Sequence, residues 1–236
     1  MNNRNYFYLP FELPVLLILL ILFIFLYPIF IFVFAGGIVE AFSRLGFNPV
    51  TGTFLFLLSL FGSLINIPLT TVTTSAPIVR EKVVYFYGIP YRIPFLTEET
   101  TTISINIGGA IIPVCISIYE FMRLLYIGKL NVALTSILGI IVVSIIIHLF
   151  AKPVKGVGIA VPFFIPPIVT AIVALILSRQ YAPAVAYISG TIGTLIGADL
   201  INLNKIGELG APVVSIGGAG TFDGIFLTGI FSTLLV

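Results

Sequence analysis

The chain has 236 residues, of which 59% are hydrophobic and only 8% are charged, with a formal net charge of +2. Because soluble domains carry roughly 25% charged residues, this composition excludes an ordinary soluble enzyme and indicates an integral membrane protein. The basic residues are scattered, so we expect no nucleic-acid partner. Because Cys115 is the single cysteine, we also expect no disulfide framework and no cysteine-rich metal site.

The apolar runs predict one polytopic all-α membrane domain over residues 1–236, with six to seven transmembrane helices. Residues 13–36 predict the first span, since about 20 apolar residues cross roughly 30 Å of hydrocarbon. Glu40 and Arg44 stand four residues apart within residues 38–47, which predicts a separate short amphipathic helix in the membrane interface. Residues 53–69 predict the second span.

The extramembrane loop over residues 70–104 is the most polar part of the chain. Residues 83–87 and 91–95 are β-branched or aromatic and are joined through Gly88 and Pro90, which predicts a β-hairpin. The third span then begins with Asn106, Gly108 and Gly109. Adjacent glycines predict an unwound or closely packed helix start, which membrane proteins tolerate where protein or a water-filled cavity meets it.

Spans four, five and six are predicted over residues 131–150, 168–177 and 184–203, and residues 155–167 predict a broken start to the fifth span. Ser189, Gly190, Gly193 and Gly197 put small side chains at three- and four-residue spacing, which predicts close approach of another helix.

Other polar side chains in these spans favour structural roles. Glu120 and Arg123 predict an ion pair on one helical face, and His148 predicts a contact with lipid headgroups at a span end. With no second histidine we expect no zinc site, and we expect no metal and no cofactor.

Lysine and arginine residues are more numerous in the loops on one side of the predicted spans than in those on the other. The positive-inside rule therefore predicts a multi-pass protein of the cell membrane whose N-terminus and residues 70–104 are cytoplasmic. Membrane lipid is the expected partner, and homo-oligomerisation stays open.

The C-terminal segment over residues 184–236 contains both aspartates of the chain, Asp199 and Asp223. A carboxylate at membrane depth is costly, so each is a functional-site hypothesis by default. Residues 215–220 include three glycines, each costing roughly 1 kcal/mol in a helix relative to alanine. This stretch therefore predicts an extended or re-entrant segment, with a helix that begins at Thr221 or Phe222 and carries Asp223 in its first turn.

Two carboxylates a few ångström apart share one proton, which is the chemistry of an aspartic protease. Asp199 and Asp223 are then the catalytic pair of an intramembrane protease, and a transmembrane peptide is its substrate. The residues expected to shape substrate approach are mostly glycines: Asn106, Gly108, Gly109, Gly197, Gly217, Gly218, Gly220 and Thr221. The same carboxylates could instead serve a small H⁺- or Na⁺-coupled transporter or channel, or have a structural or regulatory role.

Four runs resemble the prokaryotic multi-pass membrane proteins catalogued as domain of unknown function 1614. They are INIPL at 65–69, INIGGAIIPV at 105–114, GTLIGADLINL at 193–203 and SIGGAGTFDGIFLTGI at 215–230. This resemblance implies a family from about residue 50 to the C-terminus, and no settled activity.

A second resemblance is to intramembrane aspartyl proteases of the presenilin and signal peptide peptidase class. It consists of two aspartates on consecutive final spans with glycines nearby. Asp199 follows Ala198 where that class has tyrosine, the glycine pair before Asp223 stands two residues too early, and no Pro-Ala-Leu motif is present.

Overall fold

The computed structural model describes residues 13–73, 78–86, 89–97, 100–154, 158–208, 211–218 and 224–236. In these residues the α-helices are α1 (Leu13–Arg44), α2 (Pro49–Gly62), α3 (Ile112–Tyr126), α4 (Leu130–Phe150), α5 (Ile165–Leu177), α6 (Ala182–Thr194) and α7 (Gly224–Leu234). The strands are β1 (Asn66–Thr73), β2 (Ile78–Phe86), β3 (Ile89–Thr97), β4 (Thr100–Asn106), β5 (Lys152–Val154), β6 (Gly158–Ala160) and β7 (Val213–Ile216).

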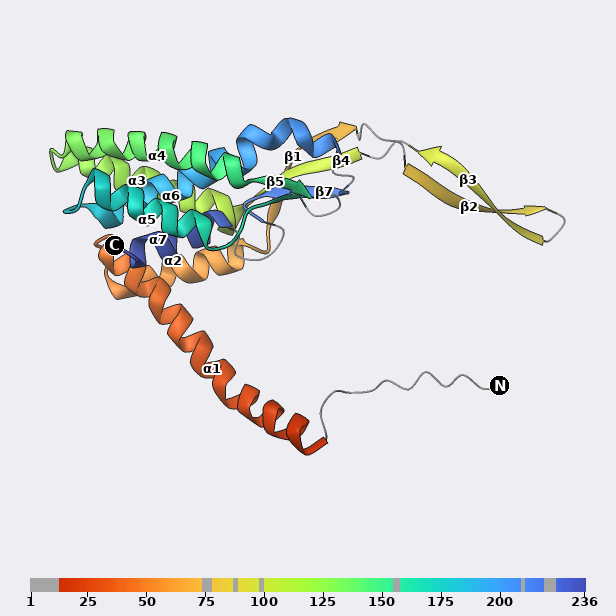
Figure 1. The fold of residues 1–236 in the computed structure, drawn as a ribbon, viewed down its shortest axis with the longest axis horizontal. Coiled ribbons are helices and arrows are strands. Elements are labelled where there is room, and N and C mark those ends of the chain that lie inside the picture. The colour runs from red at the N-terminus through yellow and green to blue at the C-terminus, as the bar shows by residue number, and fades with distance from the viewer. Residues whose placement is uncertain are drawn as a thin grey trace.

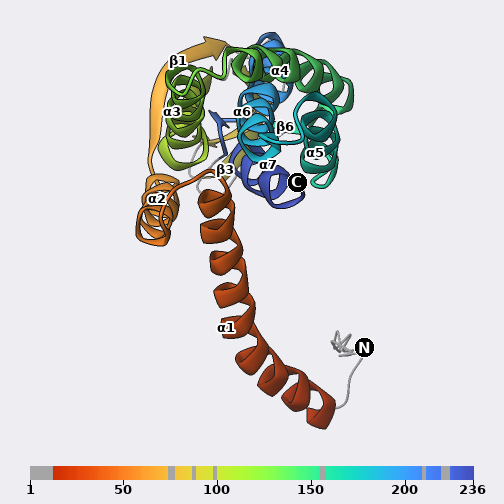
Figure 2. The same ribbon diagram turned by 90° about the vertical axis from the view of Figure 1, so that its left-hand side faces the viewer.

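Helices α2 to α7 lie side by side in one bundle, and the sheet of β1, β4 and β7 covers one end of it (Figure 1). We call this the sheet end. The opposite end, with the turns at residues 127–129 and 178–181, is the far end. The hairpin of β2 and β3 projects beyond the sheet (Figure 1). Most of α1 runs away from the bundle (Figures 1 and 2).

The two N-terminal helices correct two expectations from the sequence. Residues 38–44 form no separate interfacial helix but continue α1, because Ile38, Ala41 and Phe42 are buried against the bundle. The second helix, α2, ends at Gly62, and the chain enters β1 at Asn66, so the predicted span over residues 53–69 is wrong in its second half. Pro68 is accommodated because β1 is an edge strand with a register shift at that residue.

The β-structure follows the polar and β-branched parts of the sequence. Strands β1 and β4 pair antiparallel, and β7 adds to β4 in parallel. The hairpin predicted in residues 83–95 is confirmed as β2 and β3, which pair antiparallel from Ile78 with Thr97 to Phe86 with Ile89. Strands β5 and β6 form a second short antiparallel pair.

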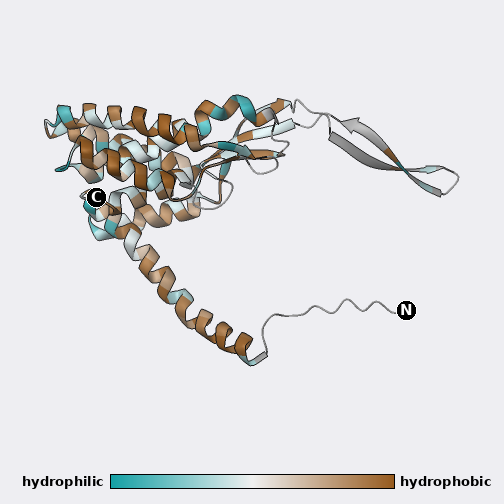
Figure 3. Cartoon of the chain, in the orientation of Figure 1, coloured by the Kyte–Doolittle hydropathy of each residue, from teal (hydrophilic) through white to brown (hydrophobic). Residues whose placement is uncertain are grey.

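In the described residues, four helical segments are long and apolar enough to cross a membrane. They are Pro14–Arg44, Ile107–Tyr126, Leu130–Phe150 and Ala182–Ile206. Many of their large apolar side chains are exposed, and the ribbons of these helices are coloured mostly as hydrophobic (Figure 3). Together these features indicate a multi-pass membrane protein. Helices α2, α5 and α7 are apolar but shorter.

Helix α6 is the centre of the bundle, and nearly all of its residues are buried. Its predicted small-residue face is confirmed in part. A Cβ atom on Gly193 would lie 2.7 Å from the Val143 side chain, and one on Gly197 would lie 2.4 Å from the Ser144 carbonyl oxygen, so α4 approaches closely here. Gly190 instead meets side chains of α5 and α7.

Candidate functional site

Asp199 lies at the sheet end, where α6 loses its regular geometry. The helix passes into a π-helical turn, η2 (Leu195–Asp199), and then into a 3-10 helix, η3 (Leu200–Glu208). Asp199 is half-buried and lines two neighbouring pockets, of about 350 Å³ and 190 Å³. Of the two predicted catalytic aspartates, the structure thus places this one beside open space.

The larger pocket lies between α6 and the first turns of α5 and α7. Pro166 of α5, Gly224 and Ile225 of α7, and the hydroxyl-bearing Thr194 and Thr228 line it with Asp199. The N-terminal ends of α5 and α7 therefore face the pocket, and the positive ends of their dipoles favour a negative charge there. Gly224 directly follows Asp223 in the sequence.

The smaller pocket is bounded by β6 on one side and β7 on the other. It is lined by Gly158, Ile159, Asp199, Leu203, Ile206, Val213, Val214, Ser215, Ile216 and Gly218. Within the described residues β6 pairs only with β5 and β7 only with β4, so each strand has a second edge without a described partner strand, and residues of both strands line this pocket. An extended peptide can add to such an edge through main-chain hydrogen bonds.

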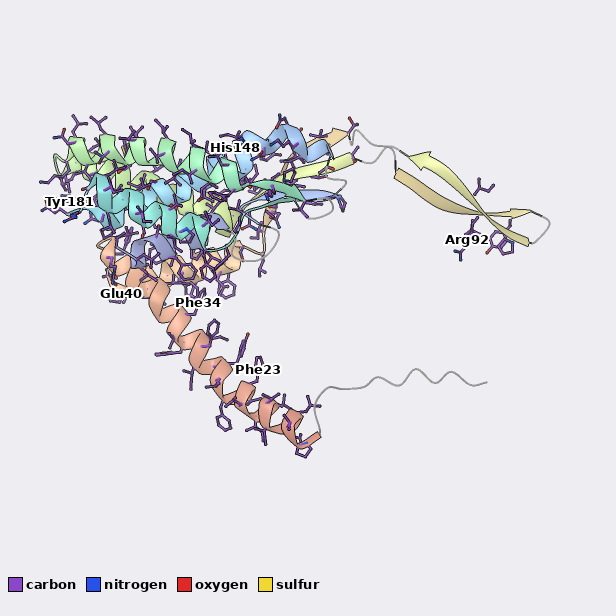
Figure 4. The ribbon with its side chains drawn as sticks, viewed as in Figure 1. Phe23, Phe34, Glu40, Arg92, His148 and Tyr181 are labelled. Carbon is purple, nitrogen blue, oxygen red and sulfur yellow. The ribbon has the colours of Figure 1, made fainter. Side chains whose placement is uncertain are left out.

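Asn202 holds the irregular end of α6 in place. Its Nδ2 atom donates to the carbonyl oxygens of Ala198 at 2.9 Å and Gly197 at 3.2 Å, and lies 3.3 Å from Nδ1 of His148. Lys205 Nζ donates to the Asn202 Oδ1 atom at 2.8 Å. His148 Nδ1 lies next to Asn202 at the sheet end of α4 (Figure 4), and its contact with lipid headgroups stays a prediction.

Sequence reasoning missed Asn202 as a residue of this site. The available signal was an amide side chain four residues after Ala198, at the position where a helix end leaves carbonyl groups unsatisfied.

A second junction brings together several of the predicted substrate-approach residues, but as tightly packed backbone. The π-helical turn η1 (Ile107–Ile111) starts α3, as the predicted closely packed helix start requires. A Cβ atom on Gly108 would lie 1.9 Å from the Ser59 carbonyl oxygen, and one on Gly109 would lie 1.9 Å from the Gly217 carbonyl oxygen. Only glycine fits at these contacts.

Asn106 fixes this junction by hydrogen bonds. Its Nδ2 atom donates to the Ser63 carbonyl oxygen at 2.7 Å and to Asn66 Oδ1 at 3.0 Å, and its Oδ1 atom accepts from the Gly109 N–H at 2.7 Å. Ser215 donates to the same Asn66 Oδ1 at 2.5 Å. Three of the four sequence runs noted above therefore meet here.

The predicted site residues thus fall into three groups. Asp199 and Gly218 line pockets, whereas Asn106, Gly108, Gly109, Gly197 and Gly217 make close packing contacts. Gly220, Thr221 and Asp223 lie outside the described residues. Among the described residues no group of three or more histidine, cysteine, aspartate or glutamate side chains could hold a metal ion.

The fold and this site define a polytopic α-helical membrane protein whose bundle carries a small β-sheet over one end, with a carboxylate beneath that sheet. The chain belongs to the family described as protein of unknown function (DUF1614), whose family model matches residues 60–235. That range contains all four sequence runs and both aspartates. No curated protein and no solved structure matches the chain, so no comparison supports the presenilin-like resemblance.

Proposed function

We propose that the chain is an intramembrane aspartyl-type protease in which Asp199 acts together with Asp223. The observation that carries this proposal is the position of Asp199 in a groove between β6 and β7. A peptide bond inside a membrane helix is shielded by the helix, so a substrate has to become extended before cleavage. Strand edges beside the carboxylate offer such a segment main-chain partners.

The larger pocket supports the pairing of the two carboxylates. Gly224, the residue after Asp223, lines this pocket together with Asp199. In the proposed reaction one ionised carboxylate takes a proton from water as the water oxygen attacks the peptide carbonyl carbon. The other, protonated carboxylate donates its proton to the carbonyl oxygen. The first carboxyl group then passes the proton taken from water to the amide nitrogen, the C–N bond breaks, and the second carboxylate takes a proton back from the diol oxygen, which restores the pair.

We also propose that the three short helices complete a seven-span arrangement. At about 1.5 Å per residue α2, α5 and α7 are roughly 17–21 Å long, so adjoining residues would complete each crossing. Alternating crossings then put the N-terminus and the sheet end on one side. Arg44, Arg123, Lys129 and Arg179 belong to the far end, so the remaining, more numerous basic residues favour a cytoplasmic sheet end.

The proposal is tested with purified full-length protein in liposomes and a fluorogenic transmembrane peptide. We expect Asp199→Asn and Asp223→Asn each to reduce cleavage by about a thousandfold or more, since loss of a catalytic acid or base removes several kcal/mol of transition-state stabilisation. Glu40→Gln, which changes an exposed carboxylate on α1, is the matched control and should cleave normally. Cleavage by the Asp199→Asn variant at the rate of the wild-type protein would contradict the proposal.

A coupled carrier for H⁺ or Na⁺ is the second candidate. It is favoured by the interruption of α6 at Asp199 and by the two short helices whose first turns face the carboxylate, because carriers bind ions at broken helices. In that case the same liposomes should show ion uptake that Asp199→Asn removes, without peptide cleavage by the wild type.

A further inference from the structure

Three buried hydroxyl groups follow one face of α6 from the middle of the bundle toward Asp199. Tyr187, Thr191 and Thr194 are spaced by four and three residues, so they share a helical face, and each is at most 2% exposed. Among the described residues none of these three hydroxyls has a hydrogen-bond partner. The Tyr187 and Thr191 hydroxyls lie close enough to interact with each other, although they do not meet the geometry of a hydrogen bond.

The neighbouring helix leaves room for this row of hydroxyls. Gly229 of α7 faces it, and a Cβ atom there would lie 2.4 Å from Thr191 Oγ1 and 3.2 Å from the Tyr187 ring. A buried hydroxyl without a protein partner is costly, and ordered water ordinarily supplies the missing hydrogen bonds. The contact between α6 and α7 is therefore a polar one, in which the hydroxyls of the row lie against the backbone of Gly229.

At the sheet end the row reaches the candidate site. Thr194 lines the larger pocket together with Asp199 and Thr228. The last hydroxyl of the row thus adjoins the space into which the carboxylate opens.

At the far end the row approaches a second buried carboxylate, Glu120 of α3, which is 1% exposed. Ile116, one turn before Glu120, belongs to the same buried cluster as Tyr187, and Leu124, one turn after it, belongs to the same buried cluster as Ile188 of α6.

Glu120 connects in turn to the far surface. It lines a pocket of about 220 Å³ with its ion-pair partner Arg123, with Arg44 and with Tyr181, which Figure 4 places at the far end.

We propose that Glu120, the three hydroxyls of α6 and Asp199, bridged by ordered water, form a proton path across the bundle. Tyr187 and Asp199 are 12 residues apart, so the row covers about 18 Å of the membrane. Each hydroxyl donates one proton to the next group and accepts one from the previous group. One proton therefore enters at one carboxylate as one leaves at the other, and no hydroxyl gains or loses a proton overall.

This path goes beyond peptide cleavage, because a groove that opens at the sheet end needs no connection to the far end for hydrolysis. The path would let Asp199 exchange protons with the opposite side of the membrane. The same route would serve the carrier candidate if its ion is H⁺.

The test measures proton entry into liposomes that contain the full-length protein and a trapped pH-sensitive dye. An external acid pulse is applied with valinomycin and potassium present to compensate charge. We expect wild type to acidify the interior faster than protein-free liposomes. Thr191→Val removes one hydroxyl at constant shape and should slow this flux by about tenfold or more, whereas Thr191→Ser keeps the hydroxyl and should retain the flux.

Ser189→Ala is the matched control on the same helix. The Ser189 hydroxyl is buried but donates to the Val185 carbonyl oxygen of its own helix at 2.6 Å, so its loss should leave the flux unchanged. Equal flux in Thr191→Val and Thr191→Ser would overturn the path, as would a wild-type flux no faster than that of empty liposomes.

Peptide cleavage measured in the same liposomes separates the two proposals. Cleavage without proton flux retains the protease and removes the path. Proton flux that depends on Thr191, with no peptide cleavage, retains the path and removes the protease.

Discussion

At the scale of single residues, buried polar side chains in this protein act as connectors between distant segments. Asn106 joins the end of α2, the start of β1 and the first turn of α3 through three hydrogen bonds. Asn202 joins the end of α6 to α4 through His148. In an apolar bundle such side chains select one arrangement of segments, because every alternative leaves buried polar groups unpaired.

Replacing Asn106 with alanine should destabilise the protein by about 3 kcal/mol, since it leaves the Gly109 N–H and the Ser63 carbonyl oxygen without this partner. The measurement is unfolding by SDS in detergent micelles, followed by circular dichroism. Asn131→Ala, at an exposed position of α4, is the control and should change stability little. Equal stabilities of the two variants would show that the Asn106 hydrogen bonds contribute nothing net.

Arg123 has a comparable role at the far end. It pairs with the buried Glu120 at 3.2 Å and donates to the Leu45 carbonyl oxygen, which ties α3 to the turn after α1. Arg123→Met leaves Glu120 buried without this partner, so we expect a loss of about 3 kcal/mol in the same unfolding assay.

The ion pair of Glu40 and Arg44 provides the contrast, because both side chains are at least 37% exposed. Glu40→Gln should change stability by less than about 0.5 kcal/mol. A loss for Arg123→Met as small as that for Glu40→Gln would mean that water reaches Glu120.

At the scale of elements, the interruptions of helices are where the structure is most constrained. The π-helical turn η1 lets the backbone of α3 touch both α2 and the residues after β7, and glycine is required at each contact. The second π-helical turn, η2, ends at Asp199 and opens the pockets. Rare π-helical turns often occur at functional sites, and this one carries the candidate carboxylate.

Gly109→Ala tests the first of these contacts. The added Cβ atom would lie 1.9 Å from the Gly217 carbonyl oxygen, so the two segments have to separate, at a cost of about 3 kcal/mol or more. Thermal unfolding in detergent is the measurement. Gly36→Ala in α1 meets nothing within 4 Å and should leave stability unchanged or raise it by about 1 kcal/mol. Tolerance of Gly109→Ala would contradict the close approach.

At the scale of the whole molecule, the bundle with its sheet and the projecting hairpin form two separate parts (Figure 1). Among the described residues β2 and β3 form a sheet only with each other, while β1, β4 and β7 form the sheet that covers the bundle. The hairpin is therefore expected to add little to the stability of the bundle.

Replacing residues 74–99 with an Asn-Gly turn should leave the bundle folded, because Thr73 and Thr100 are already paired and a two-residue turn can join them. We expect the melting temperature in detergent to change by less than about 3 °C. A deletion extended to residues 71–102 is the control, since it also removes the pairing of Thr102 with Val213 and should lower the melting temperature clearly. A similar drop in both variants would assign the hairpin a stabilising role.

Much of this architecture was readable from the sequence. The apolar runs identified the membrane class, and the predicted span over residues 131–150 agrees closely with α4. The hairpin followed from paired β-branched and aromatic runs, and the glycine-rich stretch after Ala211 correctly indicated that no continuous helix runs from there to the C-terminus. These features depend on local composition and backbone preferences, which each segment carries by itself.

Other features were decided only by the tertiary structure. Residues 38–44 continue α1 because the bundle buries their apolar face, and Asn66 begins a strand because Asn106 and Ser215, far away in the sequence, bind its side chain. Likewise, the sequence singled out Asp199, but its pockets exist because β6, β7 and the first turns of α5 and α7 converge there. The physical reason is that local sequence sets what a segment can form, whereas contacts between distant segments select which form is stable.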